Sequence, residues 1–241
     1  MVVGCVSLPI FAVAASLPLA GFVSASPGMT KILDARQLHV DVLKGCDNAT
    51  PLAERFDDGC TWGNPSYGRS AILIGDSNAG QFSEGLIAAA SRERVNLRVA
   101  TMSGCRFVEL DERVGEAAKL CDSFVRESLA ELLVNPVDLV VIANSSDDVN
   151  GYQPSDYEAG LALTINKLTD AGIKVAVIKV IPKPLKWDPG KCSPLAVLTD
   201  FGTCSFDSFP LRESFATQAA NQSEQRAADS GGAATWDYSG D

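Results

Sequence analysis

The amino-acid sequence predicts an α/β fold built on a parallel sheet, and two observations support this prediction. From residue 70 onward, short apolar runs typical of buried strands alternate with longer segments that carry apolar residues at helical spacing. This alternation is typical of a parallel sheet with helices on both faces, joined by right-handed crossovers. In addition, the chain has 241 residues, 46% of them hydrophobic. That is enough for one α/β domain of roughly 150–200 residues and a short appendage.

Five strands are expected in this part of the chain. The first is wholly apolar and ends at Gly75, and the third is strongly apolar and begins just after Pro136. The fifth opens after the pair Gly231-Gly232, which is typical of a turn. The expected strands span residues 71–74, 96–101, 137–143, 173–181 and 233–238.

Four helices are expected between and after these strands. Phe82, Leu86 and Ala90 recur at helical spacing and predict the first helix. Pro136 stops the second helix, and Gly172 is a typical C-cap for the third. The fourth is polar and Ala-rich, which favours a surface helix. The expected helices span residues 81–94, 121–134, 157–171 and 211–229.

An apolar segment, residues 1–27, precedes the domain, which we place at residues 70–241. No charged side chain occurs from residue 2 to residue 30, and the apolar run is long enough to cross a bilayer as a helix. Val23-Ser24-Ala25 also fits the cleavage site of a signal peptide, although a basic n-region is missing. A buried helix is the third alternative. A membrane span would anchor the domain outside the cytoplasm, and a cleaved signal peptide would make it secreted.

Residues 28–69 are expected to form a loop-rich leading segment closed by a disulfide. Six of the seven cysteines lie outside the apolar segment, and six cysteines allow 15 pairings. Pairing between sequence neighbours is the simplest, because each bond then closes one irregular loop. Disulfides indicate an oxidising compartment, and the absence of Cys-x-x-Cys spacing argues against a zinc site. The expected bonds are Cys46–Cys60, Cys105–Cys121 and Cys192–Cys204.

Gly75-Asp76-Ser77 joins the first expected strand to the first expected helix. This position places Ser77 at the carboxyl edge of a parallel sheet, where ligands of open α/β folds bind. It also lies near a helix N-terminus, where unpaired backbone N–H groups favour negative charge. Ser77 is therefore a candidate nucleophile whose own N–H could stabilise an oxyanion. Asp76 or Ser77 could equally cap the helix, and spacing alone does not separate the two interpretations.

Two further candidates follow the next two strands. Gly104 could supply a backbone N–H and Asn144 a side-chain amide. With Ser77 they would form an oxyanion hole, whose donors typically stabilise the transition state by about 3 kcal/mol each. Each has an ordinary alternative, because glycine beside Cys105 suits a tight turn and asparagine often caps one.

Charge and motifs exclude other classes. The net charge of −10 and the pI near 4.6 argue against nucleic-acid binding, which requires a basic face. Neither Gly-x-Gly-x-x-Gly nor Gly-Lys-Ser/Thr occurs, so a nucleotide or phosphate site is set aside. We expect no cofactor and no metal.

Gly75-Asp76-Ser77 after an apolar strand resembles the first sequence block of the SGNH (GDSL-like) hydrolases, in which the serine is the nucleophile. Ser103-Gly104-Cys105, the later cysteines and Ile181-Pro182-Lys183-Pro184 extend the similarity over residues 46–241, to SGNH domains fused to acyltransferase-three membrane proteins. The resemblance implies a three-layer α/β/α fold with a flavodoxin-like sheet. It also implies an oxyanion hole formed by Ser77, Gly104 and Asn144.

The resemblance further implies a domain that O-acetylates or otherwise esterifies cell-envelope sugars. Its partners would be an acyl donor and a polysaccharide or glycan acceptor, and the membrane through the N-terminal segment. We therefore expect an extracytoplasmic serine O-acyltransferase or esterase. The alternative is a non-catalytic SGNH-like binding or interaction domain.

The general base is unknown. The family supplies it as Asp-x-x-His near the C-terminus, whereas the single histidine here, His39, precedes the serine and suggests a surface or packing residue. Asp237 has no histidine three residues later, and Asn78 stands where the related branch usually has histidine. We favour a fragment that lacks its last C-terminal elements and is inactive alone, with a degenerate domain as the alternative.

Overall fold

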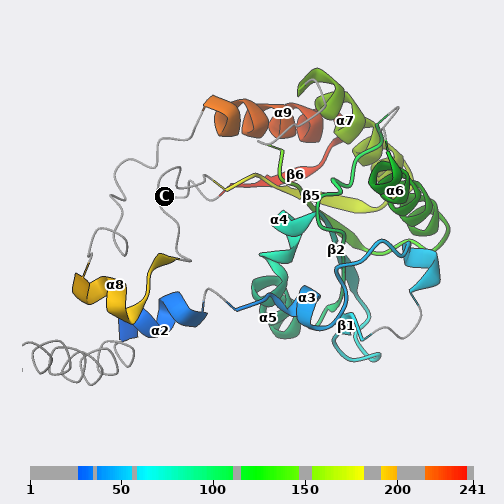
Figure 1. Cartoon of the computed structure of the whole chain (residues 1–241). Helices are drawn as coiled ribbons and strands as arrows, with labels where there is room; N and C mark the ends of the chain where they lie inside the picture. Colours follow the sequence, from blue (N-terminus) through cyan, green and yellow to red (C-terminus); the bar gives the residue numbers. More distant parts are fainter. Residues whose placement is uncertain are drawn as a thin grey trace, which may run out of the picture. The chain divides into compact units, whose positions relative to one another are not determined.

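The computed structural model describes residues 27–34, 37–55, 59–110, 115–146, 154–181, 191–199 and 215–237. By its contacts the chain divides into two units. The first comprises residues 1–38 and 183–212, and its described helices are α2 (Pro27–Asp34) and α8 (Pro194–Thr199). The second comprises residues 39–182 and 213–241 and contains the sheet (Figure 1). The domain boundaries expected at residues 27 and 69 stay a prediction.

The second unit is built on a six-stranded sheet with the order β1-β3-β2-β4-β5-β6. All neighbours pair in parallel except β1, which is antiparallel to β3. Counted along the chain, the parallel strands have the flavodoxin-like order 2-1-3-4-5, which confirms the predicted class and topology. We did not predict β1, because a strand of two residues is too short to show an alternating pattern. The strands are β1 (Thr61–Trp62), β2 (Ser70–Gly75), β3 (Asn96–Thr101), β4 (Leu139–Ala143), β5 (Lys174–Ile178) and β6 (Ala234–Trp236).

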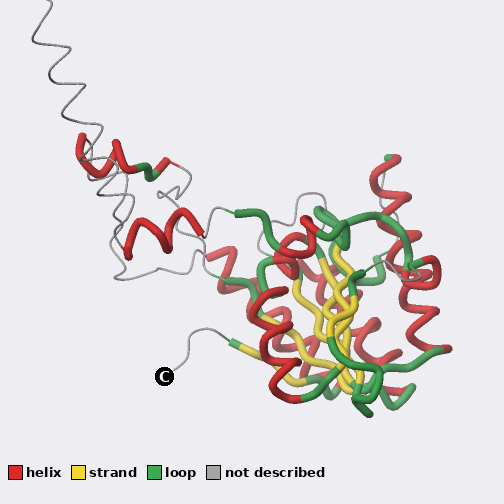
Figure 2. The backbone as a smooth tube through the Cα atoms, turned by 90° about the horizontal axis from the view of Figure 1, so that it is seen from below, coloured by secondary structure: helices red, strands yellow, loops and turns green. Residues whose placement is uncertain are grey.

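Helices cover both faces of the sheet, which confirms the three-layer arrangement (Figures 1 and 2). Three long helices, α6, α7 and α9, lie over one face, and α5 lies over the other with the short α3 and α4. The helices of this unit are α3 (Val40–Leu43), the 3-10 turn η1 (Leu52–Glu54), α4 (Ser77–Gly80), α5 (Ser83–Glu93), α6 (Glu116–Val134), α7 (Pro154–Asp170) and α9 (Phe215–Gly231).

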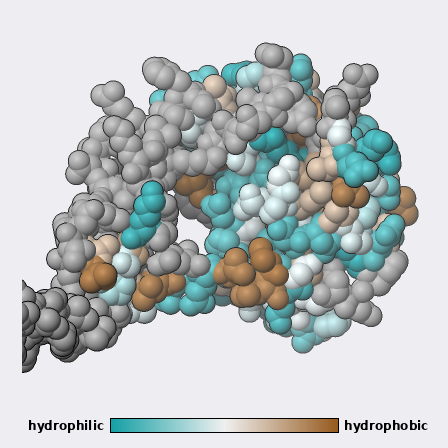
Figure 3. Space-filling model, viewed as in Figure 1, coloured by the Kyte–Doolittle hydropathy of each residue, from teal (hydrophilic) through white to brown (hydrophobic). Residues whose placement is uncertain are grey.

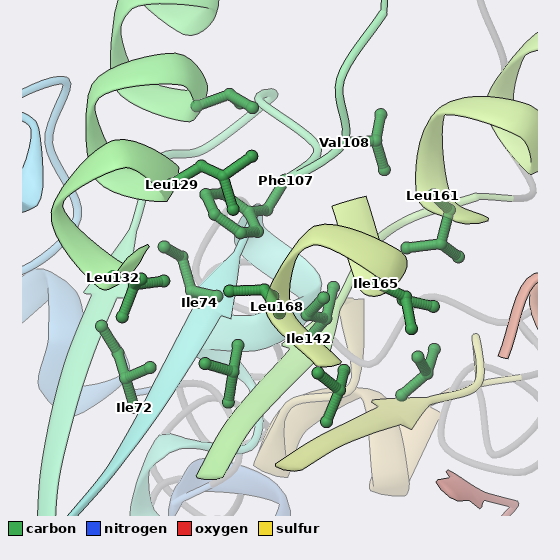
Figure 4. Packing of buried hydrophobic residues seen from close by; sticks show 14 of the residues in the cluster. Ile72, Ile74, Phe107, Val108, Leu129, Leu132, Ile142, Leu161, Ile165 and Leu168 are labelled. Carbon is green, nitrogen blue, oxygen red and sulfur yellow. The ribbon is translucent and has the colours of Figure 1, made fainter. Parts of the chain in front are cut away.

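The larger hydrophobic core lies between the sheet and α6, α7 and α9. Ile72 and Ile74 of β2 and Ile142 of β4 pack with Leu132 of α6 and Leu168 of α7 (Figure 4). All five side chains are at most 2% exposed. Burying one such aliphatic side chain stabilises a fold by roughly 1.5–3 kcal/mol, so this layer is a main source of stability.

A smaller core lies on the opposite face of the same strands. Ala71 and Leu73 of β2 alternate with Ile72 and Ile74 and pack in a cluster that includes Phe82. Because successive strand residues point to opposite faces, a strand that is apolar at every position must be covered on both sides. The unbroken apolar run of β2 therefore corresponds to a central strand.

Helix α9 is more deeply packed than its composition predicts. We expected a polar surface helix, whereas α9 lies against α7 and buries Glu224, Ala227 and Ala228. A Cβ added to Gly231 would lie 2.3 Å from Cγ2 of Ile165 on α7. The other face of α9 is exposed, as in a surface helix, and the small residues of the packed face permit the two helices to approach closely.

Two of the three expected disulfides fall within the described residues and are confirmed. Cys46 is bonded to Cys60, and Cys105 to Cys121. Cys192 is also disulfide-bonded. Its expected partner, Cys204, lies outside the described residues, so this pairing stays a prediction.

Residues 46–55 of the leading segment are organised by Arg55, which is only 4% exposed. Its guanidinium group donates hydrogen bonds to the carbonyl oxygens of Cys46 at 2.6 Å, Asn48 at 2.7 Å and Thr50 at 2.6 Å. The same group lies 5.4 Å from the ring centroid of Phe124 on α6. Arg55 thus joins three carbonyl groups of this segment to one another and brings them against α6.

The membrane span or signal peptide expected at residues 1–27 lies almost wholly outside the described residues. No helix in the described ranges is long and apolar enough to cross a membrane. The face seen in Figure 3 is mainly hydrophilic where it is coloured, with apolar side chains gathered over α3. In that helix Val42 is 43% exposed and Leu43 is 65% exposed.

Candidate active site

The register of the sheet brings the three expected site segments to one edge. Gly75 at the end of β2 pairs with Thr101 of β3 and with Ala143 of β4. These strands therefore end level with one another, and each is followed within three residues by one candidate. The edge is the carboxyl edge, where parallel α/β sheets bind ligands. The candidates that follow β2, β3 and β4 are Ser77, Gly104 and Asn144.

Asp76 and Ser77 have different roles in the turn after β2. Asp76 is the N-cap of α4, since its Oδ1 accepts the N–H of Asn78 at 2.8 Å. Its Oδ2 accepts the N–H of Ser145 at 2.9 Å. Ser77 is exposed, and neither its hydroxyl nor its N–H is hydrogen-bonded to another described residue. Capping is thus accounted for by Asp76, which leaves the Ser77 hydroxyl accessible.

Gly104 lies in a β-turn formed by residues 102–105. The turn is closed by the N–H of Cys105, which donates to the carbonyl oxygen of Met102 at 2.9 Å. Gly104 has φ of 76°, a conformation that favours glycine at the third position of such turns. The turn explains the glycine without any catalytic role. The N–H of Gly104 forms no hydrogen bond within the described residues, so it could still serve an oxyanion.

Asp47 of the leading segment holds this turn in place. Its Oδ1 accepts the N–H of Ser103, and its Oδ2 accepts the Ser103 hydroxyl, both at 2.6 Å. Asp47 follows the disulfide-bonded Cys46, while the Cys105–Cys121 bond holds the other end of the turn. The sequence does not predict this link, because Asp47 and Ser103 are 56 residues apart.

Replacing Asp47 by alanine should loosen the turn without unfolding the domain. Both hydrogen bonds to Ser103 would be lost, and bonds to a charged group contribute about 1.5–3 kcal/mol, less where they are exposed. We expect amide hydrogen exchange at Ser103 to accelerate about tenfold or more. Asp170→Ala, at an exposed carboxylate at the end of α7, is the control. Unchanged exchange at Ser103 in Asp47→Ala would contradict the prediction.

Asn144 is an interior side chain, only 1% exposed. Its Oδ1 accepts the N–H of Phe107 at 2.9 Å, and its Nδ2 donates to the hydroxyl of Tyr157 at 3.3 Å. An amide nitrogen carries two hydrogens, so one donor remains beyond the bond to Tyr157. The role of Asn144 in an oxyanion hole stays a prediction.

The segment after β4 is bonded directly to the serine turn. Asn78 donates from Nδ2 to the carbonyl oxygen of Asn144 at 3.1 Å, and Asp76 accepts the N–H of Ser145. The carbonyl oxygen of Ser145 also accepts from Nε of Arg106 at 2.7 Å. Asn78, which departs from the family's usual histidine, therefore has a structural role here. It links two of the candidate site segments.

Two buried residues at this edge were not predicted from the sequence, Tyr157 of α7 and Glu224 of α9. Oε1 of Glu224 accepts the Tyr157 hydroxyl at 3.2 Å and the Ser146 hydroxyl at 2.8 Å. Burial raises the pKa of Glu224 from 4.5 to about 7, although the hydrogen bonds from Ser146, Val180 and Tyr157 lower it. Burial, followed by the charge of Glu224, raises the pKa of Tyr157 well above 10.

A sequence signal for Glu224 did exist. Ala220, Ala227 and Ala228 are buried, and they lie four residues before, three after and four after Glu224. Residues at these spacings share one face of a helix. A glutamate within a stripe of alanines on the packed face therefore indicates a buried carboxylate, which must find hydrogen-bond donors.

His39 lies apart from these contacts. Its Nδ1 is 3.3 Å from Oε2 of Glu84, and Oε1 of Glu84 accepts the N–H of Val40 at 2.8 Å. Burial raises the pKa of Glu84, but the hydrogen bonds and the charge of His39 lower it by more, so the pKa of Glu84 is lowered overall. The pair is partly exposed and joins α5 to the residue before α3, which agrees with a surface histidine.

No cluster of three or more His, Cys, Asp or Glu side chains suited to a metal ion lies within the described residues. The groups gathered at the carboxyl edge are the Ser77 hydroxyl, backbone N–H groups, side-chain amides and the buried carboxyl groups of Asp76 and Glu224. Such groups are suited to acyl chemistry, in which a serine attacks a carbonyl and hydrogen-bond donors stabilise the oxyanion.

A three-layer domain with a serine two residues after its first parallel strand is typical of the SGNH-hydrolase-like class of α/β domains. Within this class the chain belongs to the family of SGNH domains fused to AT3 domains, whose sequence profile matches residues 45–238. The match begins within the leading segment and includes the whole sheet.

One solved structure supports the fold. The periplasmic domain of a lipopolysaccharide acetyltransferase from Salmonella ser. Paratyphi A is similar, with a TM-score of 0.61 and 14% identity over 89% of this chain and 80% of that chain. At this identity the likeness shows the fold alone. TesA is a more distant neighbour, with a TM-score of 0.42 and 17% identity over 69% of this chain and 77% of that chain. No curated protein matches the chain.

Proposed function

We propose that this chain is an extracytoplasmic serine O-acyltransferase or esterase domain that acts on cell-envelope carbohydrate. The observation that carries the proposal is the state of Ser77. It is exposed at the carboxyl edge, its hydroxyl is unbonded within the described residues, and Asp76 supplies the helix cap. A serine that serves only as a cap would use its hydroxyl to accept a backbone N–H.

In the proposed reaction Oγ of Ser77 attacks the carbonyl carbon of an acyl ester while a base takes the hydroxyl proton. The tetrahedral oxyanion would be stabilised by the N–H groups of Ser77 and Gly104 and by the Asn144 amide, each contributing about 3 kcal/mol. Collapse expels the donor alcohol, which takes up the proton, and leaves an acyl-serine. A sugar hydroxyl or water then attacks this ester and regenerates Ser77.

The acceptor class and the location rest on the family and on the disulfides. The related domain from Salmonella is periplasmic and belongs to a lipopolysaccharide acetyltransferase, which suggests a carbohydrate acceptor here. The Cys46–Cys60 and Cys105–Cys121 bonds favour an oxidising compartment. Attachment to the membrane through residues 1–27 is part of the proposal.

The test is covalent labelling of Ser77 by a fluorophosphonate probe, with and without added imidazole. Imidazole stands in for the unassigned base, so we expect labelling to accelerate at least tenfold when it is present. Ser77→Ala should remove the label, whereas Ser91→Ala, at an exposed serine of α5, should keep it. Peptide mass spectrometry locates the label. A probe that never modifies Ser77 under either condition would overturn the proposal.

A non-catalytic binding domain is the second candidate, and one observation favours it. The only histidine of the sequence, His39, is paired with Glu84 and not with the Ser77 hydroxyl. This candidate predicts that acetylated glycans bind equally well to the wild type and to Ser77→Ala, without turnover. Binding measured by calorimetry, together with the labelling result, separates the two functions.

A further inference from the structure

Three hydrogen-bond donors converge on the buried carboxylate of Glu224, which is 0% exposed. Ser146 and Tyr157 donate to Oε1 at 2.8 Å and 3.2 Å, and the N–H of Val180 donates to Oε2 at 3.2 Å. Ser146 follows β4, Tyr157 belongs to α7 and Val180 follows β5. One side chain therefore joins three elements that meet beside the candidate active site.

The chain of bonds from Asn144 to Glu224 has a fixed direction. A backbone N–H can only donate, so Phe107 requires Oδ1 of Asn144 on its side, and Nδ2 must then face Tyr157. The Tyr157 oxygen accepts from Nδ2, and its own proton is directed to Glu224. The sequence of donors thus ends on Glu224, whose ionised form can accept on both oxygens.

We propose that Glu224, acting through Tyr157 and Ser146, is a positioning residue that sets the orientation of the Asn144 amide and of the segment after β4. The bonds themselves concern residues 144–146, and their relevance to catalysis rests on the proposed function of Ser77. Glu224 does not itself contact the exposed serine turn through any hydrogen bond between described residues.

Protonation of Glu224 disturbs this arrangement. Oε1 already accepts two hydroxyls, so a proton on Oε1 would displace one of them, whereas Oε2 accepts only the N–H of Val180 and keeps room for a proton. In either case the carboxylate loses its charge, and hydrogen bonds to a neutral acceptor are weaker than those to a charged one. The protonated and ionised forms of Glu224 are both populated near neutral pH, because burial raises its pKa to about 7 although its hydrogen bonds lower it.

Other ionisable groups lie near Glu224. The charge of Asp76 raises the pKa of Glu224, whereas Tyr157 lowers it as a hydrogen-bond donor. On α7 and α9, Glu158 accepts two bonds from Arg226 at 2.9 Å and 2.7 Å. After β5 and β6, Lys179 lies 3.3 Å from Asp237. These last four groups pair with one another, so they leave Glu224 without a bonded cation in the described residues.

The test follows the side-chain amide resonances of Asn144 by ¹H–¹⁵N NMR between about pH 5.5 and pH 8.5. We expect one titration with a midpoint near neutrality in the wild type, and none in Glu224→Gln. Tyr157→Phe removes the connecting hydroxyl and should shrink the Asn144 titration at least fivefold. Glu158→Gln alters a carboxylate on the same pair of helices outside the chain of bonds, and it should titrate as the wild type does.

Two outcomes would overturn the inference. One is an Asn144 amide that does not respond to pH in the folded wild type, and the other is an unchanged titration in both Glu224→Gln and Tyr157→Phe. Fluorophosphonate labelling of Ser77 in the same samples tests the proposed function separately. Titration of Asn144 without labelling would support the positioning role and reject the catalytic one. Equal labelling rates in all variants, with no titration of Asn144, would support the catalytic role of Ser77 and reject the positioning role of Glu224.

Discussion

Gly75→Ala should destabilise the domain by about 3 kcal/mol or more. A Cβ at this position would lie 1.9 Å from the carbonyl oxygen of Ala143 in the neighbouring strand β4. Gly75 also has φ of 153°, which side chains rarely adopt. Overpacking and backbone strain each cost roughly 1–3 kcal/mol, and here neither can relax because β4 is a central strand.

The measurement is the free energy of unfolding from urea denaturation with the disulfides intact. Gly85→Ala is the matched control, because Gly85 lies in α5 with no heavy atom within 4 Å of an added Cβ. Alanine is favoured over glycine within a helix by about 0.5–1 kcal/mol, so this variant should be slightly more stable. Equal stabilities for Gly75→Ala and the wild type would mean that β2 and β4 do not meet as closely as described.

The second large effect is a pH dependence of stability that originates from Glu224. Its folded-state pKa of about 7 lies above its usual 4.5 because burial penalises the charged form. The folded protein therefore holds this proton more tightly than the unfolded chain does. The resulting stabilisation is fully present below about pH 4.5 and is lost as the pH rises through about 7. The total is roughly 3 kcal/mol, at about 1.4 kcal/mol for each unit of pKa.

About 2 kcal/mol of this loss should fall between roughly pH 5.5 and pH 8.5, a range that avoids the pI near 4.6. Glu224→Gln lacks the titrating group. Over the same pH range its free energy of unfolding should therefore fall by about 2 kcal/mol less than that of the wild type. Glu158→Gln should follow the wild type, since the pKa of Glu158 is lowered by its bonds to Arg226. Parallel curves for the wild type and Glu224→Gln would contradict a buried, titrating Glu224.

Most of the fold could be predicted from local patterns. The apolar run before Gly75 marks the central strand, and its bounds differ from the observed β2 by one residue at each end. Pro136 and Gly172 also mark helix ends to within two residues. These predictions succeeded because strand and helix periodicity are properties of consecutive residues.

The candidate site was predicted less completely. Parallel topology was enough to bring the segments of Ser77, Gly104 and Asn144 to one edge. It could not tell that Asn144 is buried and directed toward Tyr157, or that Asp76 rather than Ser77 caps α4. Side-chain orientation depends on partners from other elements, and a single sequence does not reveal them.

The sequence by itself determined the class of fold, the strand that precedes the serine and the family resemblance, because each depends on residue type and spacing along the chain. Only the tertiary structure decided which groups surround that serine. The bonds that join Ser146 and Tyr157 to Glu224 span 78 and 67 residues. They exist because three elements pack together around one buried carboxylate, whose need for hydrogen-bond donors is met only when the chain is folded.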